Sequence, residues 1–317
     1  MAKRIFRNPW PHAEHGIPDI LRWKLGLLPH EQAVMRDAPN APASWTQLDP
    51  SAIAIAPERG CRITWLGHAS FLIQIGACNL LIDPVFSDHC APLPLPSLRR
   101  KVAPPCKIED LPSIDCILLT HSHYDHLDLP TLRTLGMDSR ILVAEGHAAW
   151  LKRKGFEKST DVPWWQSIDL KPSLQITSTP AQHFTARSAW DRNHGHWCGW
   201  AIHTGGLTVW HAGDTGYCPA FQEIGNRLGP IDFAMIPIGA YQPRSIMEPM
   251  HMNPEEAVQA LMDAGCRRSV AMHWGTFRLT DEPMGEPPLR FRDALQTHGL
   301  DDSLHQVGAV GQSWEIA

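Results

Sequence analysis

Short apolar stretches alternate with polar segments along this chain of 317 residues, most regularly from residue 61 onward. Most of the stretches contain four or five aliphatic or β-branched residues and are bounded by Gly, Pro, Asp or Asn, a pattern that predicts strands. Ten strands are predicted, at residues 62–65, 71–75, 79–82, 116–119, 141–143, 174–177, 200–202, 207–210, 233–236 and 269–272.

Helical periodicity appears between these stretches and predicts six helices, at residues 17–28, 129–135, 147–154, 219–228, 254–264 and 289–298. The clearest start is at Asn253, a favourable N-cap residue that is followed by Pro254 at the first helical position. Strand pairs early in the chain and strand–helix units later predict an α/β protein. We expect an αββα sandwich, in which two mixed sheets carry helices on their outer faces.

The first 60 residues are Pro-rich and irregular, apart from the helix predicted at residues 17–28. We therefore expect an N-terminal extension of residues 1–60 and one domain of residues 61–317. That domain is long enough to bury a core without disulfides. The eight cysteines are scattered without a C-x-x-C pair, which is typical of reduced thiols.

The composition of 43% hydrophobic and 19% charged residues excludes a disordered or coiled-coil protein. The net charge of −5 at pH 7 argues against nucleic-acid binding, which depends on neutralising phosphates. The start of the chain lacks the continuous apolar run of a secretory signal. The uncharged stretch of residues 63–82 contains polar residues and glycines, which favours strands over a membrane span. We expect a cytoplasmic protein.

The strongest chemical signal is THSHYDHLD at residues 120–128, directly after a predicted strand. It contains four potential metal ligands: His121, His123, Asp125 and His126. The side chains of His121 and His123 point the same way from an extended backbone, because they are two residues apart. Asp125 and His126 follow where a helix begins and can face a neighbouring position. The spacing therefore predicts two metal ions held side by side.

Two metal ions need more ligands than this loop contains. His183, Asp214 and His273 each follow a predicted strand. Taken singly, a buried hydrogen-bonded histidine or an aspartate in a turn explains each of them. Their shared position at strand ends, where α/β folds gather functional groups, makes them candidate ligands.

The order H-x-H-x-D-H, a distant His, an Asp in G-D-T and a final His resembles the metallo-β-lactamase superfamily, whose fold is the αββα sandwich. More specifically, the chain is similar to the family of N-acyl-phosphatidylethanolamine-hydrolysing phospholipases D. The similarity covers nearly the whole chain, and it is carried by NPWP at residues 8–11, WLGHA at 65–69, DP at 83–84, AGDTGYCPAFQEIG at 212–225, IPIGAY at 236–241, HMNPEEAV at 251–258 and MHWGTF at 272–277.

The resemblance implies a hydrolase domain with two zinc ions per chain. Iron or manganese remain alternatives, because His/Asp sites accept them as well. One ion would be bound by His121, His123 and His183. The other would be bound by Asp125, His126 and His273, with Asp214 as the bridge. Asp83 matches an early aspartate that orients a ligand histidine, although an aspartate in a turn before Pro84 is the alternative.

The resemblance also implies the reaction, a phospholipase D-type hydrolysis of a membrane phospholipid to N-acylethanolamine and phosphatidic acid. Asp125 would then help to position the attacking water. His251 matches a position beside the substrate phosphate, where it would bind the phosphate and protonate the leaving group. Tyr124 matches a position that contacts substrate. The alternative for His251 is a capping histidine ahead of a helix, and the alternative for Tyr124 is an aromatic residue that only packs.

A lipid substrate requires contact with a bilayer. The first 24 residues carry five Lys/Arg against two acidic residues, and Leu21 and Trp23 lie in the predicted helix. Together with the basic segment 99–101, they predict a patch that rests on anionic headgroups at the inner face of the membrane. The alternative is that Leu21 and Trp23 pack onto the domain, and Trp164 and Trp165 likewise. The resemblance further implies a homodimer.

A second enzyme function remains open, that of a metal-dependent lactonase or of a cyclic or soluble phosphodiesterase of the same superfamily. Such an enzyme would keep the metals but need no apolar groove. A nuclease is disfavoured by the acidic pI, and a non-catalytic metal scaffold by the complete ligand set. Met250 and Ala186 stand where the family has a polar amide and a basic residue, which leaves the acyl-chain preference open.

Overall fold

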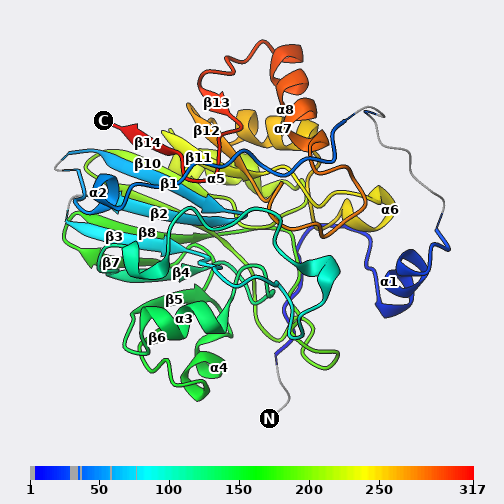
Figure 1. The fold of residues 1–317 in the computed structure, drawn as a ribbon, viewed down its shortest axis with the longest axis horizontal. Coiled ribbons are helices and arrows are strands. Elements are labelled where there is room, and N and C mark those ends of the chain that lie inside the picture. The colour runs from blue at the N-terminus through cyan, green and yellow to red at the C-terminus, as the bar shows by residue number, and fades with distance from the viewer. Residues whose placement is uncertain (1–3, 29–34, 36–37, 58, 76) are drawn as a thin grey trace.

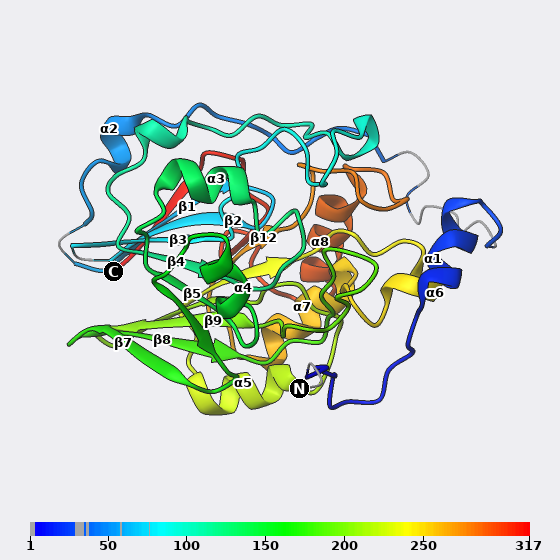
Figure 2. The same ribbon diagram turned by 90° about the horizontal axis from the view of Figure 1, so that it is seen from below.

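The computed structural model describes residues 4–28, 35, 38–57, 59–75 and 77–317. In this part of the chain the strands form two mixed sheets of seven strands each, packed face to face, with helices on the outer side of each sheet (Figures 1 and 2). The predicted αββα sandwich is confirmed.

The first sheet has the strand order β14-β1-β2-β3-β4-β5-β6. Its strands are β1 (Cys61–Gly67), β2 (Ser70–Ile75), β3 (Cys78–Ile82), β4 (Cys116–Leu119), β5 (Ile141–Ala144), β6 (Ser159–Val162) and β14 (Ser313–Ile316). The first three form an antiparallel meander, and β3 to β6 run parallel. The uncharged stretch of residues 63–82 is therefore mostly sheet.

The second sheet has the strand order β13-β12-β11-β10-β9-β8-β7. Its strands are β7 (Ser167–Lys171), β8 (Leu174–Thr179), β9 (Gly199–Thr204), β10 (Leu207–His211), β11 (Phe233–Pro237), β12 (Ser269–Met272) and β13 (His305–Gln306). β9 is antiparallel to both of its neighbours, β8 and β10, whereas β10, β11 and β12 run parallel. As a result, β8, β10 and β12 end at the same edge.

The core lies between the sheets. Because successive side chains of a strand point to opposite faces, Phe71 and Ile73 of β2 join the inner cluster, while Leu72 joins an outer cluster. The outer cluster on the first sheet contains Leu132 and Leu151 from the two helices that cover this face, α3 (Leu129–Leu135) and α4 (Ala148–Arg153).

The outer face of the second sheet is covered by α5 (Ala220–Leu228), α7 (Pro254–Asp263) and α8 (Glu286–Thr297). α7 begins where the sequence predicts, because Oδ1 of Asn253 accepts the N–H of Glu256 at 2.8 Å and Oε2 of Glu256 accepts the N–H of Asn253 at 2.9 Å. The shorter helices are α1 (Ile17–Lys24), α2 (Pro50–Ile53), α6 (Arg244–Met247), and the 3₁₀ turns Pro96–Leu98 and Ile108–Asp110.

The described part of the N-terminal extension lies against the domain. Phe6 is buried, Trp10 stacks on Trp164 with ring centroids 6.0 Å apart, and Trp45 pairs with Val310. The division at residue 60 remains a prediction. None of the helices in the described ranges is long and apolar enough to cross a membrane.

In the basic segment 99–101, Arg99 and Lys101 are exposed as expected, but the residue between them is not. Arg100 is buried, and its guanidinium donates to the carbonyls of Val85, Ser87 and Val102. Burial lowers the pKa of Arg100 to about 10. The prediction that Arg100 belongs to a surface patch is therefore wrong, because its cation braces the loop from inside.

Candidate metal centre

The candidate ligands follow strands that end at one edge of the sandwich. In the first sheet, β1, β3 and β4 run in the same direction, and in the second β8, β10 and β12 do so. His121 opens the loop after β4, whereas His183, Asp214 and His273 follow β8, β10 and β12. The two halves of the sandwich thus contribute ligands from opposite sides.

Asp214 lies at the centre of the cluster. Its Oδ2 atom is 3.0 Å from Nε2 of His273 and 3.1 Å from Nε2 of His126. The Nε2 atoms of His183 and His121 lie 3.8 and 3.9 Å from the same oxygen. One carboxylate oxygen therefore faces imidazole nitrogens from both sheets, as a carboxylate that bridges two cations must do.

The other candidate ligands form two groups, and within each group the ligand atoms lie within 4.8 Å of one another. The first group consists of His121, His123 and His183. The second consists of Asp125, His126, His273 and also His68, and His251 groups in the same way with His183 and Asp214. Apart from His68 and His251, these are the two sets that the resemblance assigns to separate ions, and in the second set Oδ2 of Asp125 is 3.5 Å from Nε2 of His273.

Three buried ligand atoms have no hydrogen-bond partner among the described residues. They are Oδ1 of Asp214 and the Nε2 atoms of His126 and His273, which lie 3.1 and 3.0 Å from Oδ2 of Asp214 but outside hydrogen-bond geometry. A buried polar atom without a partner is costly, and such atoms in a native structure indicate a missing ion or water. Imidazole and carboxylate are the donors that zinc, iron and manganese accept. The donor set therefore fits divalent cations.

The charges in the cluster also fit a cation. The pKa of Asp214 is held well below its usual range, because the positive charges of His126 and His273 outweigh the opposing effect of burial. Burial lowers the pKa of His123 to about 4 and that of His183 to about 3. Against the effect of burial, Asp214 and Asp125 hold the pKa of His126 well above its usual value and raise that of His273 to about 9. These two imidazoles must therefore release a proton when they bind a cation.

Hydrogen bonds orient the histidine ligands from behind. The carboxylate of Asp83 accepts a hydrogen bond from Nδ1 of His126 at 2.7 Å, and its other oxygen accepts the N–H of Thr120 at 2.8 Å. Nδ1 of His183 lies 2.9 Å from the carbonyl of Met250. In both cases the partner occupies Nδ1 and leaves Nε2 for a cation. This geometry supports the predicted orienting role of Asp83 over that of a simple turn residue.

His251 lies between the two ligand groups, in the loop between α6 and α7. Its ring centroid is 5.0 Å from that of His183 and 5.3 Å from that of His273. Its Nδ1 atom is buried without a hydrogen-bond partner among the described residues, and burial holds the pKa of His251 well below its usual value. Its position suits a group that touches the substrate rather than one fixed behind a ligand.

Tyr124 is half-buried and contacts Arg187. Its hydroxyl donates to the carbonyl of Arg187 at 3.0 Å, and the Arg187 guanidinium lies 3.9 Å from the centroid of its ring. The same guanidinium donates to the carbonyls of Ser122 and Leu127, at 2.7 and 2.8 Å. Arg187 therefore braces the loop that carries four candidate ligands. The contact of Tyr124 with substrate stays a prediction.

Sequence reasoning missed three residues of this site: Arg187, His68 and Asn8. Nε2 of His68 lies 2.9 Å from Oδ2 of Asp125. The side-chain amide of Asn8 donates to the carbonyl of His183 at 3.0 Å and accepts its N–H at 3.2 Å. The WLGHA and NPWP motifs contain the latter two residues, and recurrence of these motifs in the family was the signal that could have found them.

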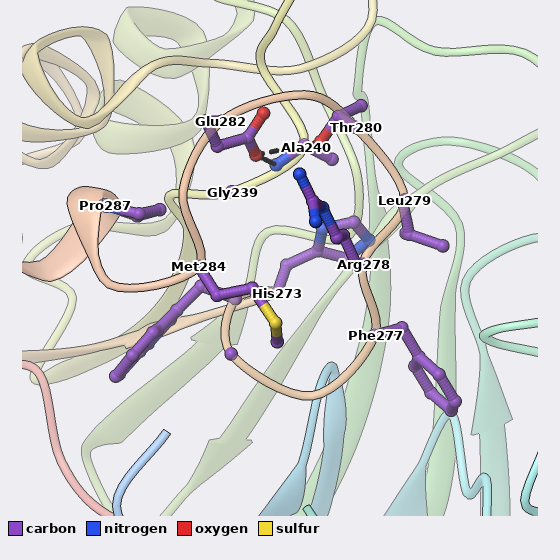
Figure 3. A pocket seen from close by; sticks show the side chains of 12 residues that line it. Gly239, Ala240, His273, Phe277, Arg278, Leu279, Thr280, Glu282, Met284 and Pro287 are labelled. Atoms are coloured by element: carbon purple, nitrogen blue, oxygen red, sulfur yellow. Dashed lines mark hydrogen bonds between the residues drawn. The ribbon is translucent and has the colours of Figure 1, made fainter. Parts of the chain in front are cut away.

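Two cavities adjoin the cluster. A narrow one, of about 20 Å³, lies behind His273, and Figure 3 shows it lined by Phe277, Arg278 and the loop from Gly239. Glu282 lines it as well and accepts the N–H of Ala240 at 2.7 Å. This volume holds about one water molecule, so it cannot admit a substrate.

The larger cavity has a volume of about 480 Å³ and reaches the first ligand group. His183, Phe184 and Met250 form one side, and residues 5–16 of the N-terminal extension form the other. The extension is therefore a wall of the space beside a candidate ligand. Its size is within the range that small-molecule sites occupy.

Comparison with known proteins agrees with this geometry. The beta-lactamase superfamily domain matches residues 78–274. An N-acyl-phosphatidylethanolamine-hydrolyzing phospholipase D 1 of Caenorhabditis elegans is 35% identical over 340 aligned positions, which cover 99% of this chain and 93% of the relative. A mitochondrial enzyme of the same name from Saccharomyces cerevisiae is 33% identical over 75% of this chain and 53% of its own length.

Among solved structures, a metallo hydrolase from the archaeon Ignicoccus hospitalis superposes with a TM-score of 0.63. The two sequences are 25% identical, and the match covers 82% of this chain and all of the archaeal one. The region that matches the superfamily domain contains all seven candidate ligands, from His121 to His273.

Proposed function

Since this chain belongs to the beta-lactamase superfamily and, within it, to the family of N-acyl-phosphatidylethanolamine-hydrolysing phospholipases D, we propose that it cleaves N-acyl-phosphatidylethanolamine to N-acylethanolamine and phosphatidic acid. The observation that carries the proposal is the convergence of seven His and Asp ligands from both sheets, in a chain that aligns with nearly the full length of the nematode enzyme.

We propose that the two ligand groups each bind one zinc ion and that Asp214 contacts both, because its Oδ2 atom faces imidazole nitrogens of both groups. Bound cations would supply Lewis-acid activation of water and would stabilise negative charge on the phosphoryl group. Iron or manganese fit the same donors, so metal analysis of the purified protein decides among them.

The remaining steps fall to one of the ligands and to two side chains outside the ligand set. Asp125, besides its role as a ligand, helps to position the attacking water. His251 binds a phosphate oxygen, whose negative charge favours the protonated imidazole over the neutral form that burial favours. It gives that proton to the leaving alkoxide, because an alkoxide departs slowly at neutral pH without one. Tyr124 contacts the substrate after its bond to Arg187 opens. The sandwich holds these groups on the ends of strands, which keeps their geometry fixed.

Product analysis tests the substrate assignment. The protein is incubated with N-acyl-phosphatidylethanolamine vesicles in heavy-oxygen water, and the products are examined by mass spectrometry. Phosphatidic acid that carries the label, with unlabelled N-acylethanolamine, is expected, because water attacks phosphorus. A lactone and a soluble diester are assayed in parallel. Faster turnover of either one would replace this proposal by a lactonase or a soluble phosphodiesterase.

The helix α1 supports a peripheral contact with the inner face of a membrane. One side of it, with Ile20 and Trp23, packs on Ile246 and Met247 of α6 and on Phe184 beside the candidate site, and Figure 2 shows α1 next to α6. Trp23 therefore packs onto the domain, which is the alternative to a membrane contact for this residue. Trp164 packs against the core as well.

The other side of α1 and the turn after it leave three leucines in solvent. Leu21, Leu25 and Leu27 have exposed fractions of 55%, 69% and 68%. Arg22 and Lys24 lie in the last turn of the same helix, and the Lys24 ammonium lies 3.5 Å from the centroid of the Trp23 ring. A helix that carries both apolar and cationic side chains suits a contact with anionic lipid. A homodimer remains a further proposal, which light scattering can test.

Replacing Leu21, Leu25 and Leu27 by serine should lower the turnover of vesicles about tenfold or more and leave that of a soluble diester unchanged. Half-burial of three leucines in a bilayer is worth about 2–4 kcal/mol, and each 1.4 kcal/mol is about tenfold in binding. Ile55→Ser is the control, because Ile55 is 79% exposed but lies outside this helix. Equal losses on both substrates would contradict a membrane contact.

A further inference from the structure

His68 occupies a turn that the fold holds in an unusual conformation. It lies between β1 and β2 with a φ of +52°, a left-handed backbone region that is uncommon outside glycine, although His, Asn and Asp adopt it more often than other residues. Its side chain is 1% exposed. Such strain persists only where the surroundings enforce it, and it is concentrated at functional sites.

The side chain of His68 makes one hydrogen bond, to a candidate ligand. Its Nε2 atom is 2.9 Å from Oδ2 of Asp125. An ionised carboxylate only accepts hydrogen bonds, so Nε2 carries the proton and has no lone pair left for a cation. His68 is therefore not itself a ligand through this nitrogen. Its ring packs edge-on against Phe277, with centroids 5.2 Å apart.

The backbone of the same turn contacts a second candidate ligand. The carbonyl of His68 accepts the N–H of His273 at 3.1 Å. The N–H of His68 donates to Oγ1 of Thr276 at 2.9 Å, in the loop that follows β12. One residue of the first sheet is thus bonded to Asp125 by its side chain and to the loop of the second sheet by its backbone.

We propose that His68 is a positioning residue for one of the two cations: its N–H holds the carboxylate of Asp125 in the orientation in which that carboxylate binds metal, while its backbone fixes His273. A carboxylate oxygen has two lone pairs, so it can accept this hydrogen bond and still serve a cation. The inference rests on the metal centre proposed above, but it does not depend on a lipid substrate.

Two substitutions separate the hydrogen bond from the turn. His68→Asn tolerates the left-handed backbone but is too short to reach Asp125, whereas His68→Gln can place an amide N–H near the position of the imidazole Nε2. Metal-free protein is titrated with zinc by calorimetry, and metal content is measured after dialysis. We expect His68→Asn to weaken the binding of one ion about tenfold or more, as loss of such partners does, and His68→Gln to restore most of it.

The same titration in an Asp125→Ala background shows whether His68 acts through Asp125. There, His68→Asn should change the affinity for the remaining ion less than about twofold, because the contact is already absent. His147→Asn is the matched control, since His147 is also buried but bonds only the carbonyl of His196 with its ring. If His68→Asn does not fold, His68→Gly takes its place, because glycine adopts this backbone freely and carries no donor.

Unchanged zinc binding by His68→Asn would overturn the inference and leave the metal centre intact. Equal weakening by His68→Asn and His68→Gln would also overturn it, because the N–H would then be irrelevant. A wild-type protein that binds no cation would refute the metal centre itself, and the inference with it.

Discussion

Asp214→Ala is expected to abolish hydrolysis and to lower the metal content of the protein below two ions per chain. Its Oδ2 atom lies within 3.9 Å of Nε2 of four histidines from both ligand groups. Without this carboxylate, each group keeps only three protein ligands and loses a negative charge that offsets the two cations. Loss of a residue that merely orients a ligand costs about 10–100-fold, so loss of a shared ligand should exceed that.

Asp214→Asn tests the charge at constant size and should lose nearly as much activity as the alanine variant. Asp232→Ala is the control, because Asp232 is also buried and hydrogen-bonded but pairs with Arg267 outside the cluster. Metal content by mass spectrometry and turnover of a soluble diester are measured for all three variants. Near-normal turnover by Asp214→Ala with two bound ions would contradict a centre that depends on a bridging carboxylate.

His251→Ala is expected to lower turnover about a hundredfold or more while the metal content stays at the wild-type level. General acid catalysis contributes about 10²–10⁴ to such reactions. No described residue hydrogen-bonds its Nδ1, in contrast to His126 and His183, whose Nδ1 atoms are held by Asp83 and by a carbonyl. Nδ1 of His273, a candidate ligand, also lacks a partner among the described residues, and the ligand atoms of His251, His183 and Asp214 lie within 4.8 Å of one another. The metal content of His251→Ala therefore decides between a role toward the substrate and metal binding.

The leaving group supplies the sharper test of His251. A nitrophenolate leaving group departs without a proton, whereas an alkoxide needs one. His251→Ala should therefore lower the rate of hydrolysis much less for a nitrophenyl diester than for an alkyl diester. His203→Ala is the control, because His203 lies at the far end of β9 and bonds Thr208. Loss of a metal ion from His251→Ala would mean that His251 is a ligand. Equal losses for both leaving groups would mean that it binds phosphate without giving up a proton.

Most of the sandwich is predictable because its central strands are apolar on both faces. All ten predicted strands are present, and each of them carries side chains for the inner or outer cluster. β7 escapes prediction because its burial alternates between exposed and half-buried residues and leaves no apolar run. α8 starts at Glu286 rather than at 289, since two prolines that look like helix breakers lie in the first turn, where no N–H donor is needed.

The candidate ligands are predictable because their spacing and their position after strands are visible in the sequence. The residues that hold them are not, because each contact joins distant parts of the chain. His68 reaches Asp125 across 57 residues, and Asn8 reaches His183 across 175. Likewise, Arg100 looks like a surface cation in the sequence, and only its three carbonyl partners reveal an internal brace.

The candidate ligands come from both sheets, four from the loop after β4 and three from the loops after β8, β10 and β12. An ion bound among them would therefore link the two halves of the sandwich. When the free ion concentration is a hundred times the dissociation constant, binding adds about 2.7 kcal/mol to the stability of the native state. A cell short of the metal would then hold a protein that is idle and also more readily degraded. The abundance of the enzyme would thus follow the supply of its ion, without any dedicated regulator.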